Sequence, residues 1–269
     1  MPTYQLKTAD EPFQKPTDGR LSSVTAAIQV LKTFSEAEAE IGISSLAKRL
    51  GLAKSTAHRL ATTLLAEGLL EQNSENGRYR LGIELFALGA LARRRLSVSN
   101  EAIPHLQVLR EQTDETIHLV ILESTNIIYL YSLESTQAIR MRSYIGVRKP
   151  AFCTAEGQAI LAFSPPQTVG LVLQDGLVAR TPKTNTNSAT FLKALEAVRV
   201  DGYAIDDEES EIGMRGIAAP IRDVTGRVVA AVGIGGPVQR LTKKALRGFT
   251  SLLVGSAESI SARLGYRAG

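Results

Sequence analysis

The stretch "GLAKSTAHRLATTLLAEGLLEQNSENGRYRL", residues 51–81, decides the fold of the N-terminal third of this chain. Its apolar residues recur at i, i+3, i+4, i+7 and i+8, which predicts a helix with one buried face from Lys54 or Ser55 to Gly68. The residues of this face are Ala57, Leu60, Ala61, Leu64 and Leu65. Apolar and polar residues then alternate around Asn76-Gly77, a dipeptide that favours a hairpin with a two-residue turn because both positions tolerate a positive φ.

Two further helices are predicted just before this stretch. Residues 23–37 carry apolar side chains at helical spacing, which are Val24, Ala27, Ile28, Leu31 and Phe34. This stripe is a candidate for the domain core or for a dimer contact. Residues 43–50 predict a second helix, with Ser44 as its N-cap and Gly51 at its end. Two helices joined by a short turn and followed by a hairpin indicate a winged helix-turn-helix, expected over residues 21–82.

The polar face of the helix after Lys54 has the chemistry of a DNA-reading surface. Thr56, Arg59 and Thr63 are spaced i, i+3 and i+7 opposite the apolar face. Hydroxyl groups can contact bases or phosphates, and an arginine can pair bidentately with guanine. The hairpin arginines suit the DNA backbone or the minor groove. The residues expected to face double-stranded DNA are Lys54, Ser55, Thr56, His58, Arg59, Thr63, Arg78 and Arg80. The alternative is a winged module that contacts only protein.

Charge and composition agree with a cytoplasmic DNA-binding protein. The 269 residues have a net charge of +4, but residues 41–95 alone carry +5 and the remainder sums to −1. A positive N-terminal third suggests a polyanionic partner there. No run of 18 apolar residues predicts a membrane span, and residues 1–20 lack the apolar core of a signal peptide, so we expect a disordered tail there. The single cysteine, Cys153, fits a reducing compartment.

The C-terminal two thirds predict a mixed domain. Residues 83–99 indicate a linker helix, and residues 100–269 then alternate between helices and largely antiparallel strands, so the fold class is α+β. Helices are expected over 101–113, 154–164, 189–202 and 243–264, and strands over 116–123, 126–134, 138–145, 215–223 and 227–236. The Asn/Thr-rich residues 180–188 are expected to form a surface loop.

The motifs in both parts resemble one family. "VTAAIQVLKTFSE…GISSLAKRLGLAKSTAHRLATTLLAEGLLEQ…GRYRLG" is similar to the DNA-binding domain of IclR-type bacterial transcriptional regulators. The resemblance continues through "PAFCTAEGQAILA" and "DGYAIDDEESEIGMRGIAAPIRDVTGRVVAAVGIGGP" and spans roughly residues 21–265. It implies a winged helix-turn-helix joined by a linker helix to a GAF-like α/β effector-binding domain, operator DNA as a partner, and a homodimer or homotetramer.

The resemblance also implies where a small organic acid or related metabolite binds. It places the effector between the start of the helix after Cys153 and the strand after the acidic loop. The implied residues are Met141, Thr154, Ala155, Glu156, Asp206, Met214 and Gly216. Free backbone N–H groups at the start of that helix would attract a carboxylate. Asp206 could instead be a turn carboxylate, and the two methionines could be core residues.

Two residues depart from the family pattern. Gln158 replaces the usual lysine, and Glu156 places a negative charge where an anion would dock. Either Glu156 points away or the effector is not a simple carboxylate. Gly233 and Gly235 share one strand face, and with Gly216 they predict a roomy, less polar cavity for an aromatic or longer-chain acid rather than glyoxylate or pyruvate. The alternative is that these glycines permit close backbone packing or a bulge.

The chain shows no arrangement that predicts catalysis, a cofactor or a metal. Cys153 and His118 could imitate a thiol–imidazole pair, but no third group orients them. "GIGGP" lacks the spacing of a phosphate loop, and His58, His105 and His118 lack metal-ligand spacing. We therefore expect a ligand-responsive regulator rather than an enzyme. The alternative function is a constitutive DNA-binding protein whose C-terminal domain only oligomerises.

Overall fold

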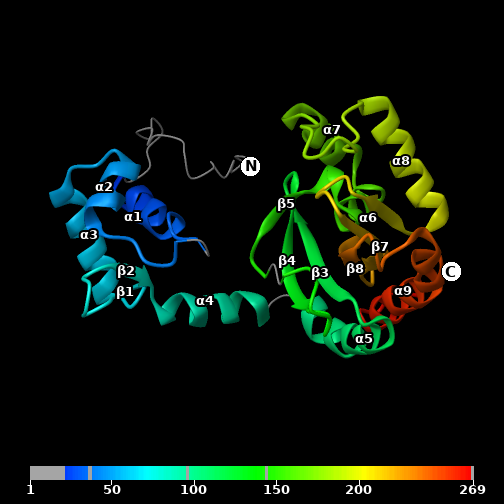
Figure 1. The fold of residues 1–269 in the computed structure, drawn as a ribbon, viewed down its shortest axis with the longest axis horizontal. Helices are drawn as coiled ribbons and strands as arrows, with labels where there is room; N and C mark the ends of the chain where they lie inside the picture. Colours follow the sequence, from blue (N-terminus) through cyan, green and yellow to red (C-terminus); the bar gives the residue numbers. More distant parts are fainter. Residues whose placement is uncertain (1–21, 36–37, 95–96, 143–144, 268–269) are drawn as a thin grey trace. The chain divides into compact units, whose positions relative to one another are not determined.

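The structure is a computed structural model, and it describes residues 22–267 except 36–37, 95–96 and 143–144 (Figure 1). The chain divides at residues 95 and 96 into two compact units. The tail expected at residues 1–20 lies outside the described residues.

The N-terminal unit is a helix-turn-helix with a small hairpin. Its elements are α1 (Ser22–Lys32), α2 (Ile43–Leu50), α3 (Lys54–Ala66), β1 (Leu70–Gln72), β2 (Tyr79–Leu81) and α4 (Ile83–Arg94). Its core joins one face of each of the first three helices to the hairpin, through Val30, Ile41, Leu46, Leu64, Leu70 and Tyr79. Backbone hydrogen bonds of 2.9 Å in both directions link Ile41 to Tyr79, so the hairpin is fixed to the helices. The predicted winged helix-turn-helix is confirmed, and we call the β1–β2 hairpin, residues 70–81, the wing.

The structure divides the apolar stripe of the first helix between core and surface, and it corrects the predicted N-cap of the second helix. Val24 and Ile28 are exposed, whereas Ala26 and Val30 are buried. The apolar spacing allowed both faces, and packing of α1 against α3 selects the one with Val30. Helix α2 begins at Ile43, so its N-cap is Gly42 and not Ser44, while Gly51 ends it at a left-handed φ of 62° as predicted.

The turn of the wing is also longer than the predicted two residues. Asn73 N–H donates to the carbonyl of Arg78 (2.8 Å), which leaves residues 74–77 as the loop, and Gly77 has a φ of 67°. Asparagine side chains explain the extra residues. The side-chain oxygen of Asn73 accepts from Glu75 N–H (2.9 Å), and that of Asn76 accepts from Arg78 N–H (2.8 Å).

The C-terminal unit contains one six-stranded antiparallel sheet in the order β5–β4–β3–β8–β7–β6. Its strands are β3 (Thr116–Glu123), β4 (Asn126–Leu133), β5 (Arg148–Pro150), β6 (Ala204–Asp207), β7 (Met214–Arg222) and β8 (Val228–Pro237). Its helices are α5 (Ser97–Thr113), α6 (Ala155–Leu161), α7 (Pro166–Asp175), α8 (Ser188–Asp201) and α9 (Lys243–Arg263), and a 3-10 turn (Ala151–Cys153) precedes α6. This architecture agrees with the predicted α+β class.

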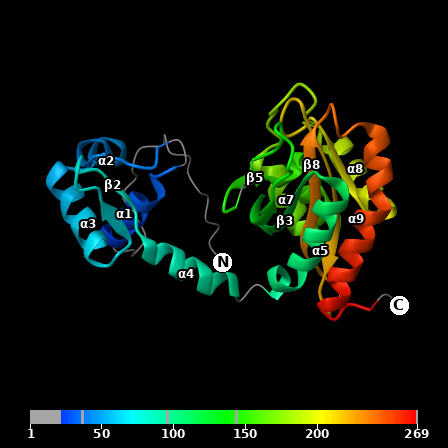
Figure 2. The same ribbon diagram turned by 60° about the horizontal axis from the view of Figure 1, so that its bottom comes forward.

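Helices cover both faces of this sheet (Figures 1 and 2). Side chains alternate along β3, so that Ile117 and Leu119 pack in the core under α5 and α9, while Val120 packs in the core under α6, α7 and α8. His118 therefore points toward the α6 face. No helix within the described ranges is long and apolar enough to cross a lipid bilayer.

Several boundaries in this unit differ from the sequence prediction. The described part of residues 138–145 forms no strand; instead β5 pairs with β4 further along the chain. Arg140 there pairs with Glu134 (2.8 Å), and Ile139 beside it is exposed. Helix α4 ends at Arg94 and α5 begins at Ser97, so the expected linker helix does not run to residue 99. Helix α7 and strand β6 were not predicted.

Candidate DNA-binding surface and effector cavity

Helix α3 presents the predicted polar face to solvent. Ala57, Ala61 and Leu64 are buried on its inner side. The exposed residues are Lys54, Ser55, Thr56, His58, Arg59, Thr62 and Thr63. The Thr63 hydroxyl donates to the carbonyl of Arg59 (2.9 Å), so its oxygen remains available as an acceptor. None of these side chains forms an ion pair within the described residues.

The two wing arginines differ, although the sequence treated them alike. Arg78 is exposed. Arg80 lies opposite Glu71 in the hairpin register and forms an ion pair with it (2.8 Å). Hydrogen bonds from the Asn76 and Asn73 side chains lower the pKa of Glu40, which keeps this carboxylate ionised 4.0 Å from Arg80. Arg80 is thus already neutralised in part, and Arg78 is the better candidate for a DNA contact.

A small cavity lies between the sheet and α6. We call it the inner cavity, and it encloses about 20 Å³, room for one water molecule. In the sheet register, Asp206 pairs with Gly216, Gly216 with Gly235, and Gly235 with Thr116, so these residues form one row across four strands. The lining residues are His118, Tyr129, Met141, Lys149, Thr154, Glu156, Asp206, Ser210, Met214, Arg215, Gly216 and Gly235.

The cavity brings together most of the residues that the resemblance implied. Of the nine predicted effector residues, all except Ala155 and Gly233 line it. The sequence missed His118, Tyr129, Lys149, Ser210 and Arg215 as lining residues. Lys149 lies on the three-residue strand β5, which carries no periodic signal. Gln158, found where the family pattern has a lysine, donates to the carbonyl of Phe152 (3.0 Å) and is buried outside this lining.

The start of helix α6 offers fewer free N–H groups than expected for a carboxylate. The Thr154 hydroxyl caps the helix and accepts from Gly157 N–H (3.3 Å). The helix has only seven residues. A macrodipole that small adds little to anion binding, so the positive charge available to an acid lies elsewhere.

Lys149 supplies that positive charge. Its side chain is mostly buried and its ammonium lies 3.3 Å from the Glu211 carboxylate. Arg215 is bound to Asp207 (2.5 Å) and donates to the carbonyl of Leu241 (2.6 Å). His118 is uncharged at neutral pH, because burial and then the charge of Lys149 lower its pKa to about 3. Lys149 is therefore the cation of the inner cavity best placed to exchange its partner.

Glu156 lines the cavity and is only 7% exposed. Burial, and to a smaller extent the negative charge of Asp206, raise the pKa of Glu156 to about 7. A carboxyl group with this pKa is half protonated at neutral pH and can donate a hydrogen bond. The conflict that the sequence posed, a negative charge where an anion would dock, is thereby reduced.

Asp206 combines the two roles that the sequence left open. It lines the cavity and is buried, which raises its pKa. Its carboxylate also accepts hydrogen bonds from Glu209 N–H (2.7 Å), Ser210 N–H (3.3 Å) and the Ser210 hydroxyl. Asp206 therefore organises the loop after β6 and presents the same carboxylate to the cavity.

The predicted roominess at the glycines is wrong. A Cβ atom at Gly233 would collide with the Glu156 carboxyl group, and one at Gly235 would lie 2.5 Å from Met141 Sδ. These two glycines let Glu156 and Met141 approach the sheet, so they fill space rather than open it. The lining is also polar, which removes the sequence argument for an aromatic or long-chain effector.

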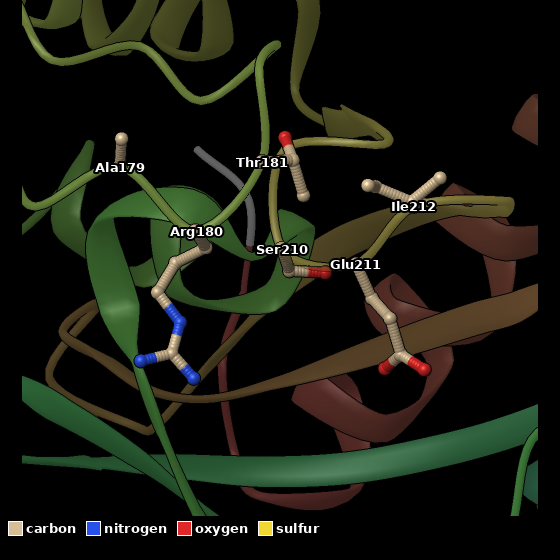
Figure 3. A pocket seen from close by; sticks show the side chains of 6 residues that line it. All are labelled: Ala179, Arg180, Thr181, Ser210, Glu211 and Ile212. Atoms are coloured by element: carbon tan, nitrogen blue, oxygen red, sulfur yellow. The ribbon is translucent and has the colours of Figure 1, made fainter.

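A second, open hollow lies outside the inner cavity. We call it the outer recess, and it has a volume of about 420 Å³. Its lining residues are Ala179, Arg180, Thr181, Ser210, Glu211 and Ile212 (Figure 3). Thr181 and Thr184 are buried and bind the loop after β6, so residues 180–188 are not simply the surface loop that was predicted.

The described residues show no catalytic or metal centre. Cys153 is buried, and burial together with the charge of Asp206 raises the pKa of its thiol to about 12, so a thiolate is disfavoured. No group of three His, Cys, Asp or Glu side chains in the described part of the chain is placed to hold a metal ion.

Comparisons with known proteins cover both units. The model of the IclR helix-turn-helix domain matches residues 23–74, and that of the bacterial transcriptional regulator IclR C-terminal domain matches residues 90–262. The HTH-type transcriptional regulator KdgR of Escherichia coli K12 is 36% identical over 247 residues, which are 91% of this chain and 94% of that protein. The regulator XynR of the same strain is 33% identical over 249 residues, or 92% and 99% of the two chains.

Solved structures agree with these matches. IclR of Thermotoga maritima has a TM-score of 0.76 and 31% identity, over 91% of this chain and 99% of that one. An IclR homolog from Microbacterium hydrocarbonoxydans, complexed with 4-hydroxybenzoate, has a TM-score of 0.81 and 26% identity, over 90% and 98% of the two chains. The chain belongs to the IclR family of bacterial transcriptional regulators.

Proposed function

We propose that this regulator binds operator DNA through α3 and the wing, and that a small organic acid in the inner cavity changes that binding. Members of the family are transcriptional regulators and not enzymes. The proposal adds which residues bind DNA and which class of small molecule binds in the cavity. One observation carries the DNA-binding part: α3 exposes a continuous polar and basic face with no ion pair within the described residues.

On DNA, α3 would enter the major groove and the wing would contact the backbone. Arg59, near the middle of the exposed face, is the candidate for bidentate pairing with guanine O6 and N7. Lys54 and Ser55 at the helix start are placed for phosphate contacts, and Thr56, His58 and Thr63 for base or sugar contacts. Arg78 is proposed to bind the backbone beside the groove, and Arg80 to join it only when DNA competes with Glu71.

A homodimer or homotetramer is proposed because one winged domain reads only a few base pairs. Exposed apolar side chains in the N-terminal unit support self-association. On α4, Phe86 is 73% exposed and Ile83 is 71% exposed, and α1 exposes Val24 and Ile28. Burial of these exposed apolar side chains against a second copy of the chain would favour association. Action on operator DNA would also require a cytoplasmic location, which we include in the proposal.

The effector is proposed to be an organic acid that also carries hydroxyl or carbonyl groups. Its carboxylate would pair with Lys149, and protonated Glu156 would donate to one of its oxygens. The Ser210 hydroxyl and Thr154 lie on the same lining and offer further polar contacts. The relative that holds 4-hydroxybenzoate, an acid with a hydroxyl group, supports this class.

The test is an in vitro selection of random duplex DNA by the full-length protein, followed by titration with small acids. We expect an enriched pseudo-palindromic duplex whose affinity changes when one of the hydroxy or keto acids is added. The acids to try are 4-hydroxybenzoate, benzoate, gluconate and pyruvate. Lys149→Met should abolish the response, whereas Arg148→Met, on the same strand but outside the cavity lining, should keep it. Enrichment without a response or a thermal shift to any acid would favour a C-terminal unit that only oligomerises.

A further inference from the structure

The loop between β6 and β7, residues 208–213, separates the inner cavity from the outer recess. Ser210 lines both spaces. Figure 3 shows Arg180 and Glu211 on either side of Ser210 at the recess. The inner cavity holds about 20 Å³, whereas the recess outside it holds about 420 Å³. Sites for small organic molecules have volumes of roughly 300 Å³ or more, so an acid cannot occupy the inner cavity unless part of its wall moves.

The base of this loop is firmly held by residues 181–184. The Thr181 hydroxyl donates to the carbonyl of Glu208 (2.6 Å), and the Thr184 hydroxyl donates to the carbonyl of Glu209 (2.7 Å). Lys183 also pairs with the Glu208 carboxylate (2.7 Å). Because these hydroxyl donors are buried, the base is the fixed part of the wall.

The tip of the loop, residues 210–212, has few contacts by comparison. The Ser210 N–H (3.3 Å) and hydroxyl donate to Asp206, the Glu211 carbonyl accepts from Met214 N–H (3.2 Å), and the Glu211 carboxylate lies 3.3 Å from the Lys149 ammonium. Ile212 is 69% exposed. The tip is bracketed by Glu208 and Gly213, whose φ angles are 65° and 81°. The tip, which has fewer contacts than the base, is thus the part of the wall that can move while the base stays in place.

We propose that the tip is the gate of the inner cavity and that the Lys149–Glu211 ion pair keeps it closed. This inference rests on the proposed effector function. An acid arrives in the outer recess, where Arg180 is exposed and forms no ion pair within the described residues. Its carboxylate then replaces that of Glu211 on Lys149, and the released tip moves aside. Exchange of one carboxylate for another keeps Lys149 neutralised throughout, which avoids leaving a buried charge unpaired.

Cys153 provides a built-in reporter of this opening because it is the only cysteine of the chain. It is 1% exposed. Cys153 directly precedes Thr154 of the cavity lining, and its thiol is close enough to feel the charges of Asp206 in the inner cavity and Arg180 in the outer recess. Reaction of the thiol with N-ethylmaleimide therefore needs opening, and its rate follows the open population when opening and closing are fast.

The experiment measures the rate of Cys153 labelling in full-length protein by mass spectrometry, without effector. Glu211→Gln should label about fivefold faster, the change expected for loss of a partly exposed ion pair. Lys149→Met should also label faster, and the double variant should accelerate labelling by clearly less than the product of the two single effects, because both substitutions remove the Lys149–Glu211 ion pair. Glu123→Gln is the matched control. It breaks the ion pair of Arg148, the neighbour of Lys149 on β5, at 2.8 Å, and should label at the wild-type rate.

Equal labelling of wild type and Glu211→Gln would overturn the gate, and so would equal acceleration in Glu123→Gln. Ser210→Ala is a second variant that loosens the tip without touching the ion pair, and it too should label faster. The experiments distinguish a failure of the gate hypothesis from a failure of the proposed function. A protein that selects no DNA but shows this labelling pattern contradicts only the function, whereas one that responds to an acid on DNA with unchanged labelling contradicts only the gate.

Discussion

Replacing Glu156 with Gln should stabilise the protein above neutral pH. In the unfolded chain Glu156 ionises near its ordinary pKa of 4.5, whereas burial raises the folded-state pKa to about 7. The stability that this group contributes is therefore complete below pH 4.5 and is lost as the pH rises to 7. Each pKa unit corresponds to about 1.36 kcal/mol, so the loss amounts to about 3 kcal/mol at pH 8. Glutamine has the same shape and cannot ionise, so it avoids this loss.

Urea unfolding at pH 5, 6, 7 and 8 measures the effect as the difference between variant and wild type at each pH. We expect that difference to be within about 1 kcal/mol at pH 5 and to favour Glu156→Gln by about 2–3 kcal/mol at pH 8, allowing for one imperfect amide hydrogen bond. Burial also raises the pKa of Glu209 to about 7, but it is present in both proteins and cancels in the difference. Glu111→Gln, an exposed change on α5, is the control and should show no pH-dependent difference. A flat difference from pH 5 to 8 for Glu156→Gln would refute the assignment of a buried, protonatable carboxyl in the cavity.

Three further outcomes follow from the contacts described. Arg78→Ala should reduce the slope of log affinity for DNA against log salt by about one, and Arg80→Ala by less, because Arg80 is already ion-paired; equal losses in fluorescence anisotropy titrations would contradict this. Gly233→Ala should cost about 1–3 kcal/mol in urea unfolding and much less in a Glu156→Ala background, and additive costs would show that the two do not collide. Phe86→Glu should weaken self-association by at least about tenfold in sedimentation analysis, and an unchanged association constant would exclude this face of α4.

The sequence was most informative where a feature depends on nearby residues. Helix α3 has a strong apolar period and Gly68 beyond its end, so its position and its exposed face followed directly from the spacing. Helix α1 has apolar residues on more than one side, and only contact with α3 determines that Val30 is buried and Ile28 is not. The wing was predicted as a hairpin, but its loop length depends on side-chain hydrogen bonds of asparagine that no alternation pattern reveals.

The inner cavity likewise contains residues that the sequence motifs located and residues that they could not locate. The motifs located Thr154, Asp206 and Gly216, which meet because α6 packs on the row of residues that crosses the sheet. Lys149 could not be found in this way, since its strand has only three residues and its partner Glu211 is distant in sequence. The spacing of the glycines on β8 could not predict a filled cavity, because spacing alone does not show which side chain fills the space that a glycine leaves.

The central claim, that α3 reads operator DNA, is tested most directly by Arg59→Ala on the duplex that the wild-type protein selects. The account predicts a loss of about 1–3 kcal/mol on that duplex, with a much smaller loss on random DNA of equal length at the same salt concentration. Arg247→Ala, which removes an exposed arginine from α9, is the matched control and should leave both affinities unchanged. An equal loss on selected and random DNA would make Arg59 a backbone contact only. Unchanged affinity of Arg59→Ala for the selected duplex would contradict the assignment of α3 as the recognition helix.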